Sequence, residues 1–434
     1  MPPVFFEVVR RSFKPSETSD AFWLQWRNPG DVFSVLLILG GDVVSRALAQ
    51  LTGTSITPVA FSFGWVAYAV AAVVSAVGEN KLMPLPDCNC KVINAKSGYV
   101  RDNSSWIVGQ IVRDYEEWMD KDIKKHLSGI LDAAWEKERD QAEKYQKGSG
   151  SSVPRPKQAG LCVSIYRAGT AVVGCPGYDL AYYIGFATTV LQLGIAAIPC
   201  GIFGDWGILL VTVGGILLSF ASGSLSEWRE EKWACRRNSY KDVILTRGNG
   251  SQHAIVVLGT GKGLDLEDLA AGQTNVDVSA SRYTRVVVTL LAALWIILLI
   301  TAAGLKKNTW FLLAVGGIGM LQNIYVAGKQ RSPQAFGVPL KFVKVIGMPK
   351  VMHTLFAVEE QYPHIGASMR ATFFPYELRH EELEKWGELK RATLLKAEDV
   401  GLDRESGSHG GGTAQIIHRT SKDGHGPSTS MTAV

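Results

Sequence analysis

Two charged residues inside an apolar stretch are the first candidates for chemistry. Asp42 and Arg46 are the only charged side chains in residues 32–51. They lie four positions apart with the acid first, which is the order that favours an ion pair on one helical face. An ionisable pair inside a membrane span has two interpretations: it marks a transport path, or it neutralises itself and fixes helix packing. We favour the packing pair and keep transport as the alternative.

A glycine-rich turn is the second candidate. The β-branched stretch 255–258 runs into Gly259, Gly261, Lys262 and Gly263, and a short helix is expected to follow. Phosphate-binding loops use this order of elements, but a Walker loop has four residues between its first glycine and the Gly-Lys pair and a Ser or Thr after the lysine. Acidic residues also follow here, where a helix N-terminus would meet phosphate. A plain turn is therefore favoured over a nucleotide site.

Cysteines are the third candidate. Cys88 and Cys90 could give two thiolates to a metal ion, but a tetrahedral zinc site needs about four ligands. No second Cys or His pair has matching spacing, and the six cysteines form no disulfide framework. We expect free thiols, no metal, no cofactor and no catalytic residue set.

The elements that would position these residues are mostly membrane helices. Residues 286–305 carry no charge, and about 20 such residues match the roughly 30 Å hydrocarbon core of a bilayer. The short polar break at 306–308 allows only a tight reversal, so residues 310–327 are predicted to return as a second helix. Small residues at 316, 317 and 319 favour close contact between helices.

Two further apolar blocks predict the same arrangement. With residues 31–78 and 179–224, the block 285–328 predicts six transmembrane helices in three hairpins. Ala60 and Gly64 begin a small-residue pattern in the first block, and Gly215, Ser219 and Gly223 form one in the second. The fold class is therefore mainly α, a polytopic membrane protein.

Charged regions separate the blocks. Residues 79–178 predict amphipathic helices, and residues 225–284 contain two β-branched stretches around Asn249-Gly250, a strong β-hairpin signal. Together these two loops predict a small cytosolic α/β module. Residues 1–30 are expected to be a cytosolic segment, residues 329–400 cytosolic helices, and residues 401–434 a disordered tail.

Basic residues set the expected orientation. The chain has a net charge of +5, and its basic residues cluster beside the apolar blocks, as in membrane proteins, rather than as a nucleic-acid footprint. With six spans, the clusters at 10–27, 81–96, 229–237 and 329–331 fall on one side. That side, with both termini, is predicted to be cytosolic. Which membrane holds the protein, and its oligomeric state, are not indicated.

Three segments resemble a known group of proteins. GDWGILLVTVGGILLSF, NGSQHAIVVLG with GLDLEDLA, and NTWFLLAVGGIGMLQNIYVAG resemble predicted multi-pass membrane proteins of filamentous fungi, over roughly residues 30–390. That family is uncharacterised, so the resemblance implies a membrane protein and carries over no activity and no site.

The function expected from these observations is non-enzymatic. We predict an integral membrane protein in the lipid bilayer whose cytosolic module binds a partner, with a cytosolic protein as the candidate. The alternatives are a transporter or channel that uses Asp42 and Arg46, and a membrane-bound enzyme with a site at 259–263.

Overall fold

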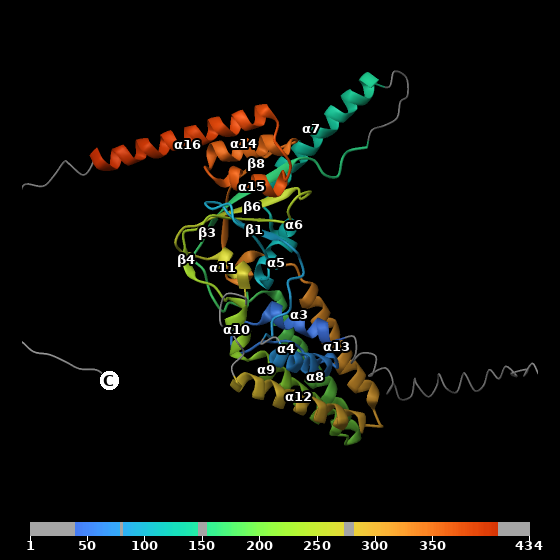
Figure 1. The fold of residues 1–434 in the computed structure, drawn as a ribbon. Coiled ribbons are helices and arrows are strands. Elements are labelled where there is room, and N and C mark those ends of the chain that lie inside the picture. The colour runs from blue at the N-terminus through green and yellow to red at the C-terminus, as the bar shows by residue number, and fades with distance from the viewer. Residues whose placement is uncertain (1–39, 79–80, 146–153, 273–281, 407–434) are drawn as a thin grey trace, which may run out of the picture. The chain divides into compact units, whose positions relative to one another are not determined.

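The computed structural model describes residues 40–78, 81–145, 154–272 and 282–406 (Figure 1). It divides into two compact units, Met1–Glu377 and Leu378–Val434. The described part of the second unit consists mainly of helix α16 (His380–Ser406), which extends into the predicted disordered tail. The rest of that tail and the predicted segment 1–30 lie outside the described residues.

Three helices are long and apolar enough to cross a membrane: α8 (Leu180–Phe203), α12 (Arg282–Ala303) and α13 (Thr309–Gly328). A fourth helix, α9 (Gly207–Gly223), is long and apolar enough only when it is taken together with α10 (Ser226–Lys232), and a bend of 41° separates the two. The protein is thus a mainly helical membrane protein with a sheet-containing part. The prediction of six spans in three hairpins is not supported.

The first predicted hairpin, residues 31–78, contains no helix long enough to cross a membrane in its described part. Helix α3 (Gly41–Leu51) has 11 residues and α4 (Gly64–Gly78) has 15. At 1.5 Å per residue they measure roughly 16 and 22 Å, short of the roughly 30 Å hydrocarbon core. Residues 57–63 between them are buried and form neither helix nor strand, whereas the apolar composition predicts a helix from residue 59. Residues 32–39 of the predicted first span lie outside the described part of the chain.

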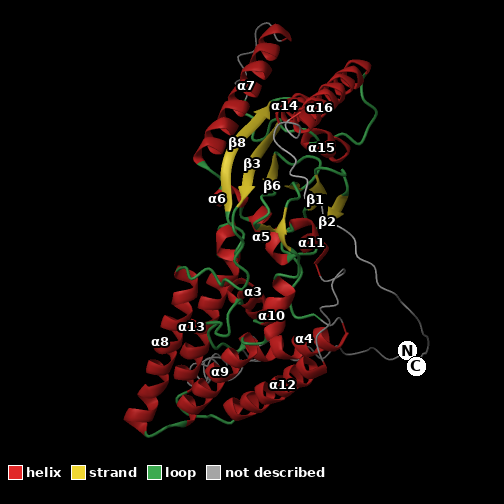
Figure 2. Ribbon diagram, turned by 90° about the vertical axis from the view of Figure 1, so that its left-hand side faces the viewer, coloured by secondary structure: helices red, strands yellow, loops and turns green. Residues whose placement is uncertain are grey.

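The long helices form two hairpins whose turns lie together. Gly204 ends α8 in a left-handed conformation, at φ +66°, and α9 follows. At the turn between α12 and α13, the Asn308 side chain donates to Asp205 Oδ2 at 3.2 Å. The two turns therefore lie at one end of the helix bundle, and the α/β part joins the other end (Figure 2).

The segment from α3 to α4 enters this bundle and returns. Thr57 donates to the carbonyl of Gly223, the last residue of α9, at 2.8 Å. Farther along, Phe61 O accepts from Gln192, near the middle of α8, at 2.7 Å. Trp65 stacks on Trp295, near the middle of α12, at 5.4 Å between ring centroids. After α4, the chain is back beside α10. We call residues 41–78 the re-entrant element.

One mixed sheet forms the core of the α/β module, with strand order β2-β1-β5-β6-β3-β8. Only β3 and β6 pair in parallel. Its strands are β1 (Lys91–Asn94), β2 (Val100–Asp102), β3 (Leu161–Ala168), β5 (Val243–Thr246), β6 (His253–Leu258) and β8 (Leu340–Met348). A separate pair consists of β4 (Arg237–Ser239) and β7 (Gly263–Leu264). The predicted β5–β6 hairpin is confirmed. Strand β8 was missed, because residues 329–400 were expected to be helical.

Short helices pack on this sheet. Helices α5 (Trp106–Arg113), α6 (Tyr115–Trp118) and α7 (Lys121–Tyr145) precede β3, and Tyr115 donates to Ser164 of β3 at 2.5 Å. Helices α14 (Val351–Gln361) and α15 (Ile365–Phe373) pack against β8, β3 and β1, while α11 (Leu266–Ala271) packs on β1 and β2. The short 3-10 helix η2 (Pro333–Phe336) precedes β8.

Two adjacent buried residues of α10 bond to backbone groups inside the re-entrant element and just after it. Lys232 Nζ donates to the carbonyls of Gln50 and Thr52, at 3.2 and 2.9 Å, where α3 ends. The Glu231 carboxylate accepts from the backbone N–H groups of Leu82 and Met83, at 2.8 to 3.0 Å, where the chain leaves α4. Because a helix C-terminus exposes unsatisfied carbonyls, the buried lysine also stabilises the end of α3.

Candidate ligand pocket of the α/β module

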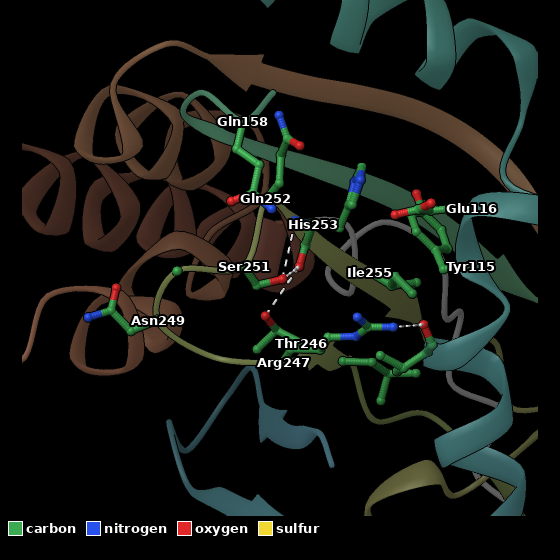
Figure 3. A pocket seen from close by; sticks show the side chains of 13 residues that line it. Tyr115, Glu116, Gln158, Thr246, Arg247, Asn249, Ser251, Gln252, His253 and Ile255 are labelled. Carbon is green, nitrogen blue, oxygen red and sulfur yellow. Dashed lines mark hydrogen bonds between the residues drawn. The ribbon is translucent and has the colours of Figure 1, made fainter. Parts of the chain in front are cut away.

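A cavity of about 290 Å³ opens beside the loop of the β5–β6 hairpin (Figure 3). We call it the hairpin cavity. Helices α5 and α6, the segment before β3, and the hairpin itself enclose it. Its lining residues are Val112, Tyr115, Glu116, Gln158, Leu245, Thr246, Arg247, Asn249, Gly250, Ser251, Gln252, His253 and Ile255.

The hairpin loop places polar groups at the cavity. Gly248 and Gly250 adopt φ angles of +94° and +83°, which glycine reaches without steric strain, so the loop can turn tightly. Thr246 accepts from the N–H of Gly248 and donates to the carbonyl of His253, both at 3.2 Å, and so ties the two strand ends together. Arg247 and His253 are thereby held on either side of the loop.

His253 contributes an uncharged ring to the lining. Its imidazole lies edge-on to the ring of Tyr115, with 5.1 Å between centroids, and its Nδ1 is buried without a hydrogen-bond partner. Burial lowers the pKa of His253; nearby Glu116 opposes this and Arg247 adds to it. A neutral imidazole with an unpaired buried nitrogen can form a hydrogen bond with a ligand that enters.

Arg247 and Glu116 supply the only formal charges in the lining. The Arg247 guanidinium lies 3.5 Å from the carbonyl oxygen of Val112, which is a marginal hydrogen bond. The structure records no ion pair for either residue within its described part, and both side chains are exposed. The cavity therefore offers one cationic and one anionic group that are free to bind a ligand.

The described lining suits recognition better than bond-breaking chemistry. The Tyr115 hydroxyl is bonded to Ser164, and burial raises the pKa of Tyr115 far above its ordinary value. No nucleophile in the lining is paired with a general base, the arrangement that nucleophilic catalysis needs.

Asp42 and Arg46 do meet, with Arg46 Nε 2.9 Å from Asp42 Oδ2. Arg46 also contacts Asp87 at 2.6 Å, and Asp87 in turn contacts Arg113 of α5 at 3.0 Å. The pair thus lies where α3 meets the α/β module, and the Asp42 side chain is 71% exposed.

Two backbone donors of the glycine-rich turn are already bound. The N–H of Gly259 donates to Asp242 Oδ1 at 2.8 Å, and the N–H of Gly261 donates to the carbonyl of Ser239 at 3.0 Å. Residue Gly263 belongs to β7 and Lys262 accepts from Ala171 through its carbonyl. A phosphate-binding loop needs free N–H groups, so this turn has a structural role in the arrangement described.

The cysteines form no ligand set in the described structure. All six, including Cys88 and Cys90, are free. Burial raises the pKa of Cys90 to about 12, which disfavours the thiolate that binds metals. No group of three or more His, Cys, Asp or Glu residues that could hold a metal ion occurs in the described ranges.

The cavity residues were not predicted as a site. Asn249-Gly250 predicted the hairpin, but Tyr115 and Glu116 lie more than 120 positions earlier and reach the cavity only through the fold. The one local signal is the polar run from Arg247 to His253 between two apolar strands. Such runs are common in surface loops, so it does not identify a site alone.

Compared with known proteins, the chain matches no family model, no curated protein and no solved structure. The resemblance to membrane proteins of filamentous fungi therefore stays a prediction.

Proposed function

We propose that this is a non-enzymatic, multi-pass membrane protein whose cytosolic α/β module binds a partner molecule in the hairpin cavity. The observation that carries the proposal is the cavity lining: a guanidinium and a carboxylate without an ion-pair partner in the described structure, and a buried imidazole nitrogen without a hydrogen-bond partner, held by one hairpin and one helix. A few polar and charged groups that converge on a cavity are typical of small-molecule sites, where they form charge-assisted hydrogen bonds with a ligand.

The cytosolic side is supported by charge. Four basic residues follow α9: Arg229, Lys232, Arg236 and Arg237. Another, Lys329, follows α13. Positively charged residues next to spans favour the cytosolic side. The resemblance to fungal membrane proteins agrees with this proposal and assigns no activity.

Filling the cavity tests the proposal. Full-length protein in nanodiscs would be heated with the small-molecule fraction of a host-cell extract. We expect an increase in the unfolding temperature, since a ligand at 100 times its Kd stabilises a protein by roughly 3 kcal/mol. Ser251→Trp should abolish the increase, because the indole occupies the loop side of the cavity. The matched control is Ser97→Trp, in the exposed β1–β2 turn. Equal shifts in wild type and Ser251→Trp would contradict the proposal.

Transport is the second candidate, and the re-entrant element favours it. Non-helical backbone at membrane depth occurs where it is buried in protein or lines a path, and transporters use it at substrate sites. The sequence suggested transport through Asp42 and Arg46, but these residues lie beside the α/β module. Transport is supported instead by the re-entrant element. Flux of a solute into proteoliposomes that falls with Gln192→Ala would favour transport over the binding proposal.

A further inference from the structure

The hairpin cavity has two separated charges of opposite sign. Arg247 comes from the end of β5, and Glu116 from the first turn of α6. Figure 3 shows the Arg247 side chain extending below Ile255, with Glu116 beside Tyr115. They are not recorded as a salt bridge, although both line the same cavity.

The rest of the lining is uncharged. Side-chain amides of Gln158, Asn249 and Gln252, the hydroxyl of Ser251 and the imidazole of His253 complete the polar part. A simple anion would pair with Arg247 but would lie near the like charge of Glu116, and a simple cation would pair with Glu116 but lie near the like charge of Arg247. Like charges at short range repel, which lowers the affinity for either simple ion. A ligand with both charges satisfies both residues.

Size narrows the class further. A cavity of about 290 Å³ lies at the lower end of the roughly 300–1,000 Å³ of small-molecule pockets. That volume suits a ligand of amino-acid size and is small for a nucleotide or a folded segment of another protein.

We propose that the hairpin cavity binds a free amino acid, with its carboxylate on Arg247 and its ammonium group on Glu116. This inference rests on the proposed function, because it assigns the ligand class of the same cavity. The neutral amides and the unpaired Nδ1 of His253 would then contact the amino-acid side chain.

The experiment measures binding of defined probes to full-length protein in nanodiscs. Each of the proteinogenic amino acids is titrated by calorimetry, and the tightest binder is compared with its carboxylic acid without the amine and its amine without the carboxylate. We expect the zwitterion to bind at least about tenfold more tightly than either, because each analogue loses one charge-assisted hydrogen-bonded pair.

Matched variants assign the two charges. Glu116→Gln should lower the affinity for the amino acid about tenfold, and it should not lower the affinity for the amine-free acid, because that ligand no longer meets the like charge of Glu116. Arg247→Gln should also lower the affinity for the amino acid about tenfold, and it should not lower the affinity for the carboxylate-free amine. Glu117→Gln and Arg237→Gln are the controls, since both residues are exposed and neither lines the cavity. The controls should bind like wild type.

The outcomes separate this inference from the proposed function. If an acid lacking the amine binds as tightly as the amino acid, the ligand class is wrong. If no amino acid binds, while an extract still stabilises wild type but not Ser251→Trp, the ligand class is also wrong and the binding site stands. If no amino acid binds to wild type and no extract stabilises it, both the ligand class and the proposed binding function are wrong.

Discussion

Glu231 and Lys232 connect the α/β module to the membrane helices through neighbouring side chains. Helix α10, which carries them, has five charged residues among seven, so we place it outside the hydrocarbon. Both side chains are at most 5% exposed. Lys232 bonds to backbone carbonyls where α3 ends, and Glu231 bonds to backbone N–H groups just after the re-entrant element.

Protonation of Glu231 should be visible in the pH dependence of stability. Burial raises the pKa of Glu231 to about 7, from an ordinary value of 4.5. The folded state therefore holds a proton that the unfolded state releases between these values. The resulting stabilisation is fully present below pH 4.5 and is lost as pH rises through 7, by up to roughly 3 kcal/mol.

Thermal unfolding of full-length protein between pH 5 and 8 measures this contribution. Glu231→Gln should flatten the fall in stability toward pH 8, whereas Glu230→Gln, an exposed neighbour, should keep it. His253 contributes with the opposite sign: its pKa is lowered, so its stabilisation is lost as pH falls below about 6.5. Identical pH profiles for wild type and Glu231→Gln would show that the carboxylate carries no such energy.

Residue spacing predicted one of these polar contacts and not the others. Asp42 and Arg46 lie one helical turn apart, so sequence alone suggested that they meet. Lys232 bonds to Thr52 across 180 positions, and its partner is a carbonyl that exists only because α3 ends there. Backbone partners leave no mark in the sequence, and so the buried pair in α10 could not be predicted.

The small residues of the long helices were predicted to pack against other helices. In the structure, several of them pack against the segment between α3 and α4. Gly185, Gly215, Gly316 and Gly319 lie on α8, α9 and α13, and a methyl group on any of them would meet residues 58–63 of the non-helical segment between α3 and α4. The glycines thus make room for backbone and rings of the re-entrant element. Sequence could identify close packing here but not its partner, because an apolar stretch without charges predicts a helix as readily as a buried extended segment.

Neighbouring glycines of α13 give a matched test of this packing. Gly319→Ala would overlap the carbonyl oxygen of Phe61, whereas Gly317 has open space around it. Overpacking costs about 1–3 kcal/mol, so we expect Gly319→Ala to lower the unfolding temperature and the yield of folded protein. Gly317→Ala should be neutral or slightly stabilising, since alanine favours a helix by about 1 kcal/mol over glycine. Equal tolerance of both changes would be evidence against the buried position of residues 57–63 between the helices.

At the scale of the whole molecule, one sheet joins three separate regions of the chain. Strand β3 precedes α8, strands β5 and β6 lie between α9 and α12, and β8 follows α13. If these helices cross a membrane, all three regions lie on the same side of it, and each long helical hairpin returns to the side it left. This requirement supports α9 as a fourth crossing.

Glycosylation mapping tests which side this is. Asn103-Ser-Ser105 and Asn249-Gly-Ser251 are glycosylation sequons in two of the three regions. In a eukaryotic host neither asparagine should carry glycan if the module is cytosolic, while a sequon placed in a lengthened 306–309 turn should be modified. A mobility shift of wild type that disappears with Asn103→Gln or Asn249→Gln would place the module on the lumenal side.

Composition predicted the class of this molecule and three of its long helices, because a charge-free run of about 20 residues has few alternatives. It also predicted that two loops contribute to an α/β module. It could not predict that β8 joins the same sheet, since β8 has charged Lys341 and Lys344 and pairs with a strand about 180 positions earlier. The hairpin cavity combines residues 112–116, 158 and 245–255, which only the fold brings together, so the sequence alone did not predict it.

The most direct test of the binding proposal locates the ligand's effect on the molecule. Hydrogen–deuterium exchange of full-length protein in nanodiscs would be compared with and without the small-molecule fraction that stabilises it. We predict slower exchange confined to residues 243–258 and 112–118, and its loss in Ser251→Trp. Slower exchange confined to the re-entrant element, with the hairpin unchanged, would contradict the proposal and favour transport.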